Sequence, residues 1–502
     1  MRACTSTKHI DGRSRLSSAH KTSLVLIGQL LVFAQGLVLT PVVIKVSGPE
    51  TYGAYILLLS YVSIVFGISS MGVGISAKRR LPSAERVDHA DIFFPQCCFQ
   101  MLSVTLLGSV SAIVYQNLDL PTHWKFSGFS GWIVPLYLLA YTAYSQGLDY
   151  FRYTHRVGIF NFASVVQPYL FISLALGIFW TTTVLNAGSL IASLTIASAL
   201  TGSLLFFWIY REIGIQVQGF KRQELSKEIR LGFPLVLAYL VDVILSGGDR
   251  YIIAAMLSVK DVGLYSPAYM IGSLAMVLPK VFGVVLPPLM SQLIDKGDAV
   301  AAKNLSDNAV RIFLAVSIPY VVGAAIVGQE VLRLYADDVV AEAAWPVIPI
   351  VATASIFYGL MLFRAYILFV RLKTSSLFHI NLICAVLNVV LNILLIYLFK
   401  NLIVAAVVTL ATYLLSYQLL GWQLKGDAIN LSIDIKEVAR ILACSVGMAL
   451  SMYLAIEISS LHGAATVGLS LIVGSATYLA LIFAQPSNRA DIVQLAKSMR
   501  AQ

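Results

Sequence analysis

Five charged side chains lie within long apolar segments of the chain. Asp242, Asp249 and Arg250 lie in residues 231–257, Lys280 in residues 262–290, and Arg364 in residues 344–370. An uncompensated charge is costly in such a segment and usually faces a partner or a cavity. Lysine presents a point charge to an anion such as a phosphate, and arginine presents a two-pronged donor. Lys280 and Arg364 therefore indicate anion binding, whereas the carboxylates indicate counter-charges or a coupling-ion site.

Each of these charges also has a structural explanation. Arg364 lies near one end of its segment, so its long side chain could extend to the membrane surface. Asp249 and Arg250 could form a charge pair at the end of a helix. Asp242 and Asp249 are seven residues apart, a spacing that brings both to one side of a helix. The sequence leaves the functional and the structural explanations open.

Uncharged polar side chains form a second candidate set. Asn381, Asn388 and Asn392 lie in residues 376–399, and their spacing places them along one stripe of a helix. Such a stripe could bind sugar hydroxyl groups, or it could fasten neighbouring membrane helices to each other. Gln146 lies 218 positions before Arg364 and is its polar counterpart if the chain is a tandem repeat.

The sequence shows no pattern that is typical of an enzyme or a metalloprotein. It lacks the Gly-Lys-Ser/Thr loop of ATP-hydrolysing proteins. The 7 histidines and 5 cysteines are scattered without metal-ligand spacing. We therefore expect no catalytic residue, no metal site and no cofactor.

The composition predicts a membrane protein. Apolar residues make up 58% of the 502 residues and charged residues only 12%, whereas soluble domains carry about 25% charged residues. The net charge of +10 is distributed over short loops rather than along one polar face. This distribution is typical of membrane topology and argues against nucleic-acid binding.

Fourteen apolar segments are long enough to cross a bilayer as helices. They are residues 23–46, 52–76, 92–115, 131–150, 157–180, 187–210, 231–257, 262–290, 309–332, 344–370, 376–399, 401–423, 438–458 and 464–484. The predicted fold class is an all-α polytopic membrane protein with about 14 transmembrane helices. Polar breaks divide it into an N-terminal lobe of six helices (1–215), a C-terminal lobe of six helices (216–424), and two further helices with a polar tail (425–502).

The basic residues predict the orientation. With 14 helices, 27 Lys and Arg residues fall on the side of the two termini and 6 on the other side, and the imbalance alternates loop by loop. Basic loops favour the cytoplasm, so we expect both termini there. No loop on either side is long enough to fold into a catalytic domain.

A short motif follows the first apolar segment and has a weaker copy later in the chain. Residues 47–55 read SGPETYGAY, and residues 258–265 read SVKDVGLY, so that Gly53 and Tyr55 match Gly263 and Tyr265 at an offset of 210. Both stretches lie between two apolar segments. The copies predict two pseudo-symmetric lobes, an architecture in which transporters bind substrate at the interface of the repeats.

These stretches resemble the polysaccharide-transport (Wzx-type) flippases. The resemblance is carried by residues 48–55 (GPETYGAY), 249–253 (DRYII), 262–265 (VGLY) and 387–395 (LNVVLNILL). It implies membership of the superfamily that also contains the multidrug exporters and the lipid II flippase. It further implies a multi-pass protein of the bacterial inner membrane that moves undecaprenyl-diphosphate-linked oligosaccharide by alternating access, with a proton or sodium gradient as a candidate driving force.

The resemblance also implies binding partners, and it leaves two alternative functions open. The partners would be the lipid-linked oligosaccharide, membrane lipids and a glycan polymerase. Lys280, Arg364, Asn388, Asn392 and Gln146 are the candidate substrate-binding residues of a central cavity, and the carboxylates with Arg250 form the coupling set. A cation-coupled multidrug exporter is the first alternative function. The cations Lys280 and Arg364 within the apolar segments suit it less well than they suit a flippase. A membrane glycan polymerase is the second.

Overall fold

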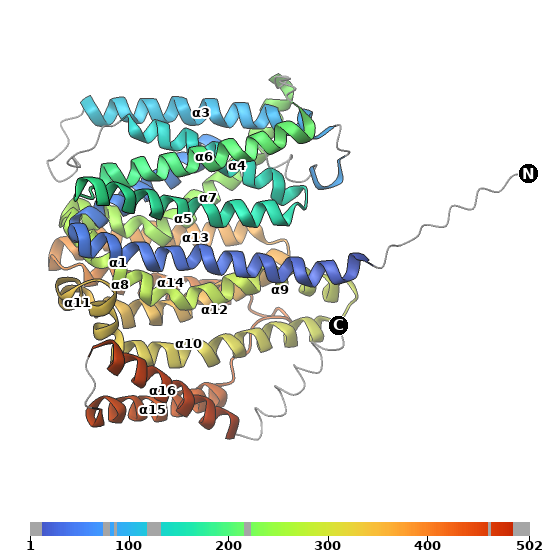
Figure 1. Cartoon of the computed structure of the whole chain (residues 1–502). Coiled ribbons are helices and arrows are strands. Elements are labelled where there is room, and N and C mark those ends of the chain that lie inside the picture. The colour runs from blue at the N-terminus through green and yellow to red at the C-terminus, as the bar shows by residue number, and fades with distance from the viewer. Residues whose placement is uncertain are drawn as a thin grey trace, which may run out of the picture. The chain divides into compact units, whose positions relative to one another are not determined.

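The computed structural model of the chain describes residues 13–73, 81–84, 88–117, 132–214, 222–459 and 463–484. These residues form helices and turns with no β-strand among them (Figure 1). Within the described residues, twelve helices are long and apolar enough to cross a membrane. One of them, Ala34–Ser70, contains two predicted segments, and α4 (Ile133–Tyr153) is a further predicted segment outside the twelve. The all-α polytopic class is therefore confirmed.

The described residues divide into two compact units, and α1 (Arg13–Ser70) and α7 (Arg222–Met256) contribute to both. The first unit also contains α3 (His89–Asn117), α4, α5 (Val157–Thr182) and α6 (Ala187–Ile213). The second contains α8 (Val259–Gly272), α9 (Val277–Asp295), α10 (Ala299–Tyr335), α11 (Asp338–Ala344), α12 (Val347–Val370), α13 (Thr374–Phe399), α14 (Ile403–Gln423), α15 (Ile435–Ile458) and α16 (Ala464–Ala484). The predicted boundary between lobes at 215 and 216 lies outside the described residues, so the division into lobes remains a prediction.

In the first unit, α4 packs against α3, α5 and α6. The aromatic rings of Phe93, Tyr150 and Phe151 are buried at the centre of this contact. Gly147 of α4 and Gly202 of α6 leave too little room for larger side chains, because a Cβ at either position would meet the opposite helix. Small residues at such contacts let membrane helices approach closely.

In the second unit, α12 is the central helix and packs against α8, α9, α10, α13 and α14. Its side chains Ile348, Val351 and Phe363 are almost fully buried. A helix that is apolar on all sides is expected at such a central place. The candidate residues on α9, α12 and α13 therefore lie on this central helix or on its neighbours.

The last two helices, α15 and α16, pack against each other and against α10 (Figure 1). Met448 and Met452 of α15, Tyr478 of α16 and Val327 of α10 form a common apolar cluster. The Tyr478 hydroxyl group donates a hydrogen bond to the Ala315 carbonyl oxygen of α10. These contacts attach the helical pair to one face of the second unit.

The first motif is a sharp break between two helices rather than the loop that the sequence predicts. Gly48 has φ 80° and ψ 170°, and helical backbone precedes and follows it without further loop residues. A positive φ costs glycine little because it has no Cβ. Pro49 follows at the first position of the next helical stretch, where its missing N–H is not needed. The predicted turn is therefore compressed into one residue.

A second break interrupts the segment that the sequence predicts as one helix over residues 262–290. Four residues, Ser273–Met276, form a 3₁₀ turn between α8 and α9. Pro279 explains this turn, because it has no N–H to donate to the carbonyl group four residues earlier, and its ring crowds that group. The irregular turn lies one helical turn before Lys280, so proline separates the Lys280 segment from α8.

Candidate functional site

Asp249 is a buried carboxylate on α7 that two donors satisfy. Its side chain is only 4% exposed. The Tyr265 hydroxyl group of α8 donates to Oδ2 at 2.6 Å, and the Arg250 backbone N–H donates to Oδ1 at 2.9 Å. Buried charges need such bonds because the desolvation cost is otherwise large. Asp249 is therefore an integral part of the contact between α7 and α8.

The start of α8 brings Tyr265 to Asp249. Ser258 caps the helix, since its hydroxyl oxygen accepts a hydrogen bond from the Asp261 N–H at 3.1 Å. This cap ends the short connection after α7 and allows α8 to return beside it. Serine is a preferred capping residue. The local sequence therefore fixes the register that pairs Tyr265 with Asp249.

Four tyrosines extend the Asp249 site across the second unit. The rings of Tyr265 and Tyr269 are 5.6 Å apart, and those of Tyr358 and Tyr413 are 5.1 Å apart. The Tyr269 and Tyr413 side chains interact electrostatically, which relates the two pairs to each other. The cluster joins α8, α12 and α14. Its hydroxyl groups are polar groups in a largely apolar interior.

Lys280 and Asp242 form a second, exposed charge site. The Lys280 ammonium nitrogen lies 5.5 Å from the centre of the Tyr358 ring, a distance at which a cation is attracted to an aromatic face. Lys280 is also the charged side chain whose field acts on the Asp242 carboxylate. Both side chains are exposed. The structure therefore brings together a cation, a carboxylate and an aromatic ring that a ligand could reach.

Tyr366 of α12 supports the Lys280 segment. Its hydroxyl group donates to the Pro279 carbonyl oxygen at 2.9 Å. Gly283 makes room for it, because a Cβ at that position would overlap the Tyr366 hydroxyl group. The backbone next to Lys280 is thereby held against α12, although Pro279 interrupts the regular hydrogen bonding there.

Arg364 does not share the Lys280 site but packs against α14. Its guanidinium carbon lies 3.7 Å from the centre of the Tyr417 ring, and the group donates a hydrogen bond to the Tyr417 carbonyl oxygen. Gly421 leaves the space for it, since a Cβ there would overlap the guanidinium group. Arg364 is half-buried. In this structure its partners are groups of the protein.

Asn388 and Asn392 are buried between α13 and α14. The Asn388 amide donates to the Thr412 hydroxyl oxygen at 3.0 Å, and the Asn392 amide donates to the Asn388 side-chain oxygen at 3.0 Å. Their exposed fractions are 1% and 0%. These bonds favour the second of the two explanations that the sequence left open, in which asparagines fasten membrane helices.

Gln146 lies in the first unit and pairs with another glutamine. Its amide donates to the Gln100 side-chain oxygen of α3, and both residues are buried. The bond joins α3 and α4. The proposed correspondence between Gln146 and Arg364 is not tested by this contact and remains a prediction.

The tyrosine cluster is the part of the site that sequence reasoning missed. Tyr265 and Tyr269 are four residues apart and therefore share one face of a helix, which is a signal the sequence contains. Tyr358 and Tyr413 carry no such signal, because only the packing of α12 against α14 brings them together. Within the described residues, no group of three or more His, Cys, Asp and Glu side chains could hold a metal ion.

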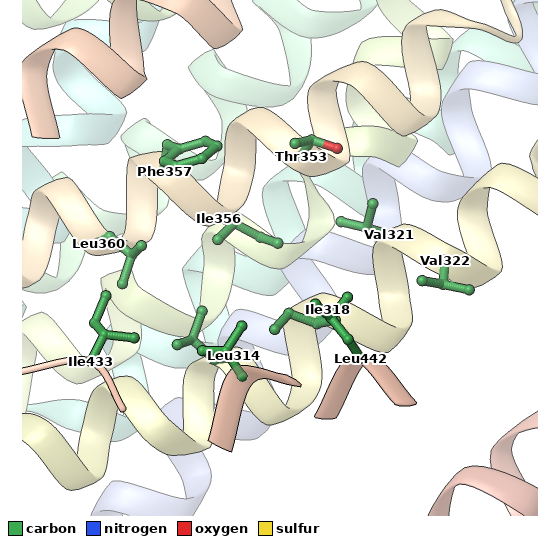
Figure 2. A pocket seen from close by; sticks show the side chains of 11 residues that line it. Leu314, Ile318, Val321, Val322, Thr353, Ile356, Phe357, Leu360, Ile433 and Leu442 are labelled. Atoms are coloured by element: carbon green, nitrogen blue, oxygen red, sulfur yellow. The ribbon is translucent and has the colours of Figure 1, made fainter. Parts of the chain in front are cut away.

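An apolar cavity of about 330 Å³ lies elsewhere in the second unit, between α10, α12 and the start of α15 (Figure 2). Its lining includes Leu314, Ile318, Ile356 and Leu442, and its one hydroxyl group, on Thr353, donates to the Pro349 carbonyl oxygen. No charged side chain lines it. The cavity suits hydrocarbon and not a charged or sugar group, so it is separate from the Lys280 site.

Comparisons with known proteins agree with this architecture. The family model described as polysaccharide biosynthesis protein matches residues 18–294, and the MatE model matches residues 234–394. The chain is 24% identical over 252 residues to a protein of Haloferax volcanii described as the probable flippase AglR. The alignment covers 49% of this chain and 52% of that relative, so the chain spans about half the length of the curated relative it matches.

Two solved structures have a similar fold. The lipid II flippase MurJ in an inward closed conformation has a TM-score of 0.67 at 14% identity, with 92% of this chain and 98% of that chain covered. An inward-facing multidrug resistance MATE family transporter of the MOP superfamily has a TM-score of 0.62 at 13% identity, with 78% and 92% covered. These likenesses concern the fold, whereas the first family model matches more than half of the sequence. The chain therefore belongs to the polysaccharide biosynthesis protein family.

Proposed function

We propose that this chain is a flippase that moves undecaprenyl-diphosphate-linked oligosaccharide repeat units from the cytoplasmic to the periplasmic leaflet of the bacterial inner membrane. The mechanism is alternating access driven by a proton or sodium gradient, with no enzymatic step. The glycan then serves surface polysaccharide assembly, with a glycan polymerase as the next protein to act. Family membership and the fold of the solved relatives support this class of function.

The exposed Lys280 beside Asp242 and Tyr358 is the observation that carries the proposal. A diphosphate group that crosses hydrocarbon must exchange water for protein cations and donors, because its transfer is otherwise prohibitively costly. Lys280 supplies such a cation within a spanning segment. Asp242 balances the Lys280 charge while the site is empty and yields to the diphosphate when substrate binds. Tyr358 supplies an aromatic face at the same place.

In this proposal Asp249 is the coupling group. Its carboxylate is buried in a spanning helix and bonded to Tyr265. Uptake of a proton or a sodium ion neutralises the Asp249 carboxylate. This change weakens the hydrogen bond that it accepts from Tyr265 of α8. Arg364 is the second substrate cation, which exchanges Tyr417 for phosphate during transport. Both roles follow from charge and position.

Deletion of the gene in its host tests the function. We expect complete lipid-linked repeat units to accumulate on the cytoplasmic leaflet, which leaflet-specific labelling of the glycan would detect. Re-expression of the chain should restore surface polysaccharide. An unchanged glycan pool combined with increased sensitivity to cationic drugs would reject the proposal.

A cation-coupled multidrug exporter is the second candidate. The buried Asp249 among Tyr265, Tyr269 and Tyr413 favours it, because aromatic and acidic groups together bind organic cations. The MatE match over residues 234–394 covers Asp249, Tyr265 and Tyr269 but ends before Tyr413. Uptake assays with a fluorescent organic cation in proteoliposomes distinguish the candidates. Concentrative cation transport without glycan flipping would favour the exporter.

A further inference from the structure

One face of α10 changes from charged to apolar along its length. Near the start of the helix, the Asp307 carboxylate accepts a hydrogen bond from the Ser432 hydroxyl group at 2.6 Å. Four residues later, the Arg311 guanidinium group forms an ion pair with Glu437 of α15. Leu314 follows Arg311 by three residues, a spacing that places both on the same side of the helix, and it lines the apolar cavity. The charged part of this face therefore ends where the cavity begins.

The cavity extends along α10, between α12 and α15 (Figure 2). α10 packs against both helices, whereas α12 and α15 form no comparable contact in the described part of the chain. The lining residues of α10 run from Leu314 to Val322, a length of about 12 Å at the rise of an α-helix. Leu442 of α15 lines the cavity and is 45% exposed. The cavity is therefore an elongated slot that is open beside α15.

The lining of the slot suits a hydrocarbon chain. Its one hydroxyl group, on Thr353, already donates to the Pro349 carbonyl oxygen. All three helices are long and apolar enough to span a membrane, so the molecules that surround them are lipids. The cavity volume of about 330 Å³ lies at the lower end of the range of small-molecule sites, about 300–1,000 Å³. The slot therefore fits part of one acyl chain and is too small for the long polyprenyl chain of the proposed substrate.

The charges at the end of the slot nearest the start of α15 have mixed signs. Val438 lines this end, and its neighbour Glu437 is paired with Arg311. Lys303 and Asp307 form a second pair on α10, with the nitrogen and oxygen 2.8 Å apart. A purely anionic headgroup would be repelled by the two carboxylates. A zwitterionic headgroup instead presents a phosphate to the cations and an ammonium group to the carboxylates.

The headgroup contacts decide which lipid is held. Lipid chains are as apolar as the side chains of the slot, so burial of a chain by itself gives little preference for one lipid over another. The Arg311–Glu437 pair is partly exposed, and ion pairs of this kind contribute little to stability. Sharing its two charges with a phosphate and an ammonium group therefore costs little. Lys436, which is exposed in the first turn of α15, provides a further cation at the same membrane surface.

We propose that the slot binds one acyl chain of a phosphatidylethanolamine molecule of the surrounding membrane, with its phosphate beside Arg311 and its ammonium group beside Glu437. The chain fills the space between α12 and α15. The lipid thereby joins the pair of helices α15 and α16 to the rest of the second unit. This site goes beyond the proposed function, because it does not depend on which substrate the protein moves.

Photo-cross-linking of the full chain in phosphatidylcholine nanodiscs tests the site. The probe is phosphatidylethanolamine with a photoactivatable group near the end of one acyl chain, and mass spectrometry locates the cross-links. Leu442→Phe narrows the slot, and Leu450→Phe, at a 61% exposed position of α15 outside the lining, is its matched control. Glu437→Gln removes the carboxylate assigned to the ammonium group. Its control is Glu330→Gln, which removes the partner of Arg333 near the other end of α10.

We expect cross-links on the lining residues of α10 and α12, and a roughly fivefold or greater loss in Leu442→Phe, because overpacking a fitted site is unfavourable. Unlabelled phosphatidylethanolamine should compete better than phosphatidylglycerol, and Glu437→Gln should reduce this preference roughly two- to fivefold. Both controls should match the unsubstituted chain. Cross-links spread evenly over the outer faces of α15 and α16 would overturn the site, as would stronger competition by phosphatidylglycerol or undecaprenyl diphosphate. If a variant does not fold, the competition on the unsubstituted chain decides.

Discussion

Lys280 carries a positive charge in a helix that spans the membrane, where a charge is costly. It lies in a spanning helix yet is exposed beside Asp242 and Tyr358. We expect Lys280→Ala to slow glycan flipping in proteoliposomes roughly tenfold or more, because a charge-assisted hydrogen bond contributes about 1.5–3 kcal/mol. Lys280→Arg should keep most of the activity. Lys425→Ala, which removes an exposed lysine from a turn, is the control, and full activity of Lys280→Ala would remove Lys280 from the mechanism.

Asp427 predicts a pH dependence of stability. Partial burial tends to raise the pKa of its carboxyl group, but hydrogen bonds from Arg371 and the Ile429 N–H together hold that pKa below its usual range. A carboxyl group with a lowered pKa stabilises the fold above its ordinary pKa, and this stabilisation is lost as the pH falls through the lowered value. We expect Asp427→Asn to lower the free energy of unfolding by about 1 kcal/mol at neutral pH.

Thermal unfolding in nanodiscs measures this difference. The melting temperatures of the variant and the unsubstituted chain should converge as the pH falls through the acid range. The control is Asp295→Asn, an exposed carboxylate for which no hydrogen bond or ion pair is found in the described part of the chain. A constant difference between Asp427→Asn and the unsubstituted chain at all pH values would show that Arg371 does not act through the Asp427 charge.

The sequence predicted the charged members of the site but not their partners. A deep lysine or aspartate is conspicuous because so few charges occur in apolar segments. The group that neutralises such a charge depends on how the helices pack. The sequence therefore could not indicate that Asp242 lies near Lys280. Tyr358 and Tyr413 look like ordinary aromatic residues of membrane helices until α12 and α14 are seen in contact.

At the scale of elements, α13 and α14 are joined by polar bonds in an apolar environment. Asn388→Leu removes the bonds to Thr412 and Asn392. We expect this change to lower the free energy of unfolding by about 1 kcal/mol while flipping continues. Thermal unfolding and a flipping assay measure the two effects. Asn381→Leu is the matched control, since the Asn381 side-chain oxygen is buried without a hydrogen-bond partner. Loss of flipping in a stable Asn388→Leu variant would instead assign Asn388 to the sugar path.

The repeated glycine motif shows where prediction of elements stops. The sequence indicated that residues 47–55 and 258–265 are copies, and it placed both between apolar segments. It could not indicate that the copies contact each other, because contacts across 210 residues depend on how helices pack. It also predicted a loop where Gly48 alone turns the chain. Spacing therefore identified the helices, whereas the contact between Gly53 and Gly263 is visible only in the folded structure.

For the whole molecule, composition was sufficient to predict the class of fold. An apolar content of 58% permits few alternatives to a bundle of membrane helices. The grouping of the helices was harder to predict from the sequence, because α1 and α7 each contribute to two compact units. Lipid solvates any apolar helix face, so apolarity alone does not reveal which faces are covered.

For the whole molecule, the testable prediction is its orientation in the membrane. The imbalance of 27 to 6 basic residues alternates with every helix, so one missed crossing would reverse it downstream. We expect Val184→Cys and Phe399→Cys to react in intact cells with a membrane-impermeant thiol reagent, and Asp295→Cys and Thr374→Cys to react only after the membrane is opened. A background in which the five native cysteines are replaced by alanine serves all four variants. A reversed pattern would place both termini outside, and Lys280 would then lie on the wrong side of Pro279 to meet a diphosphate that enters from the cytoplasm.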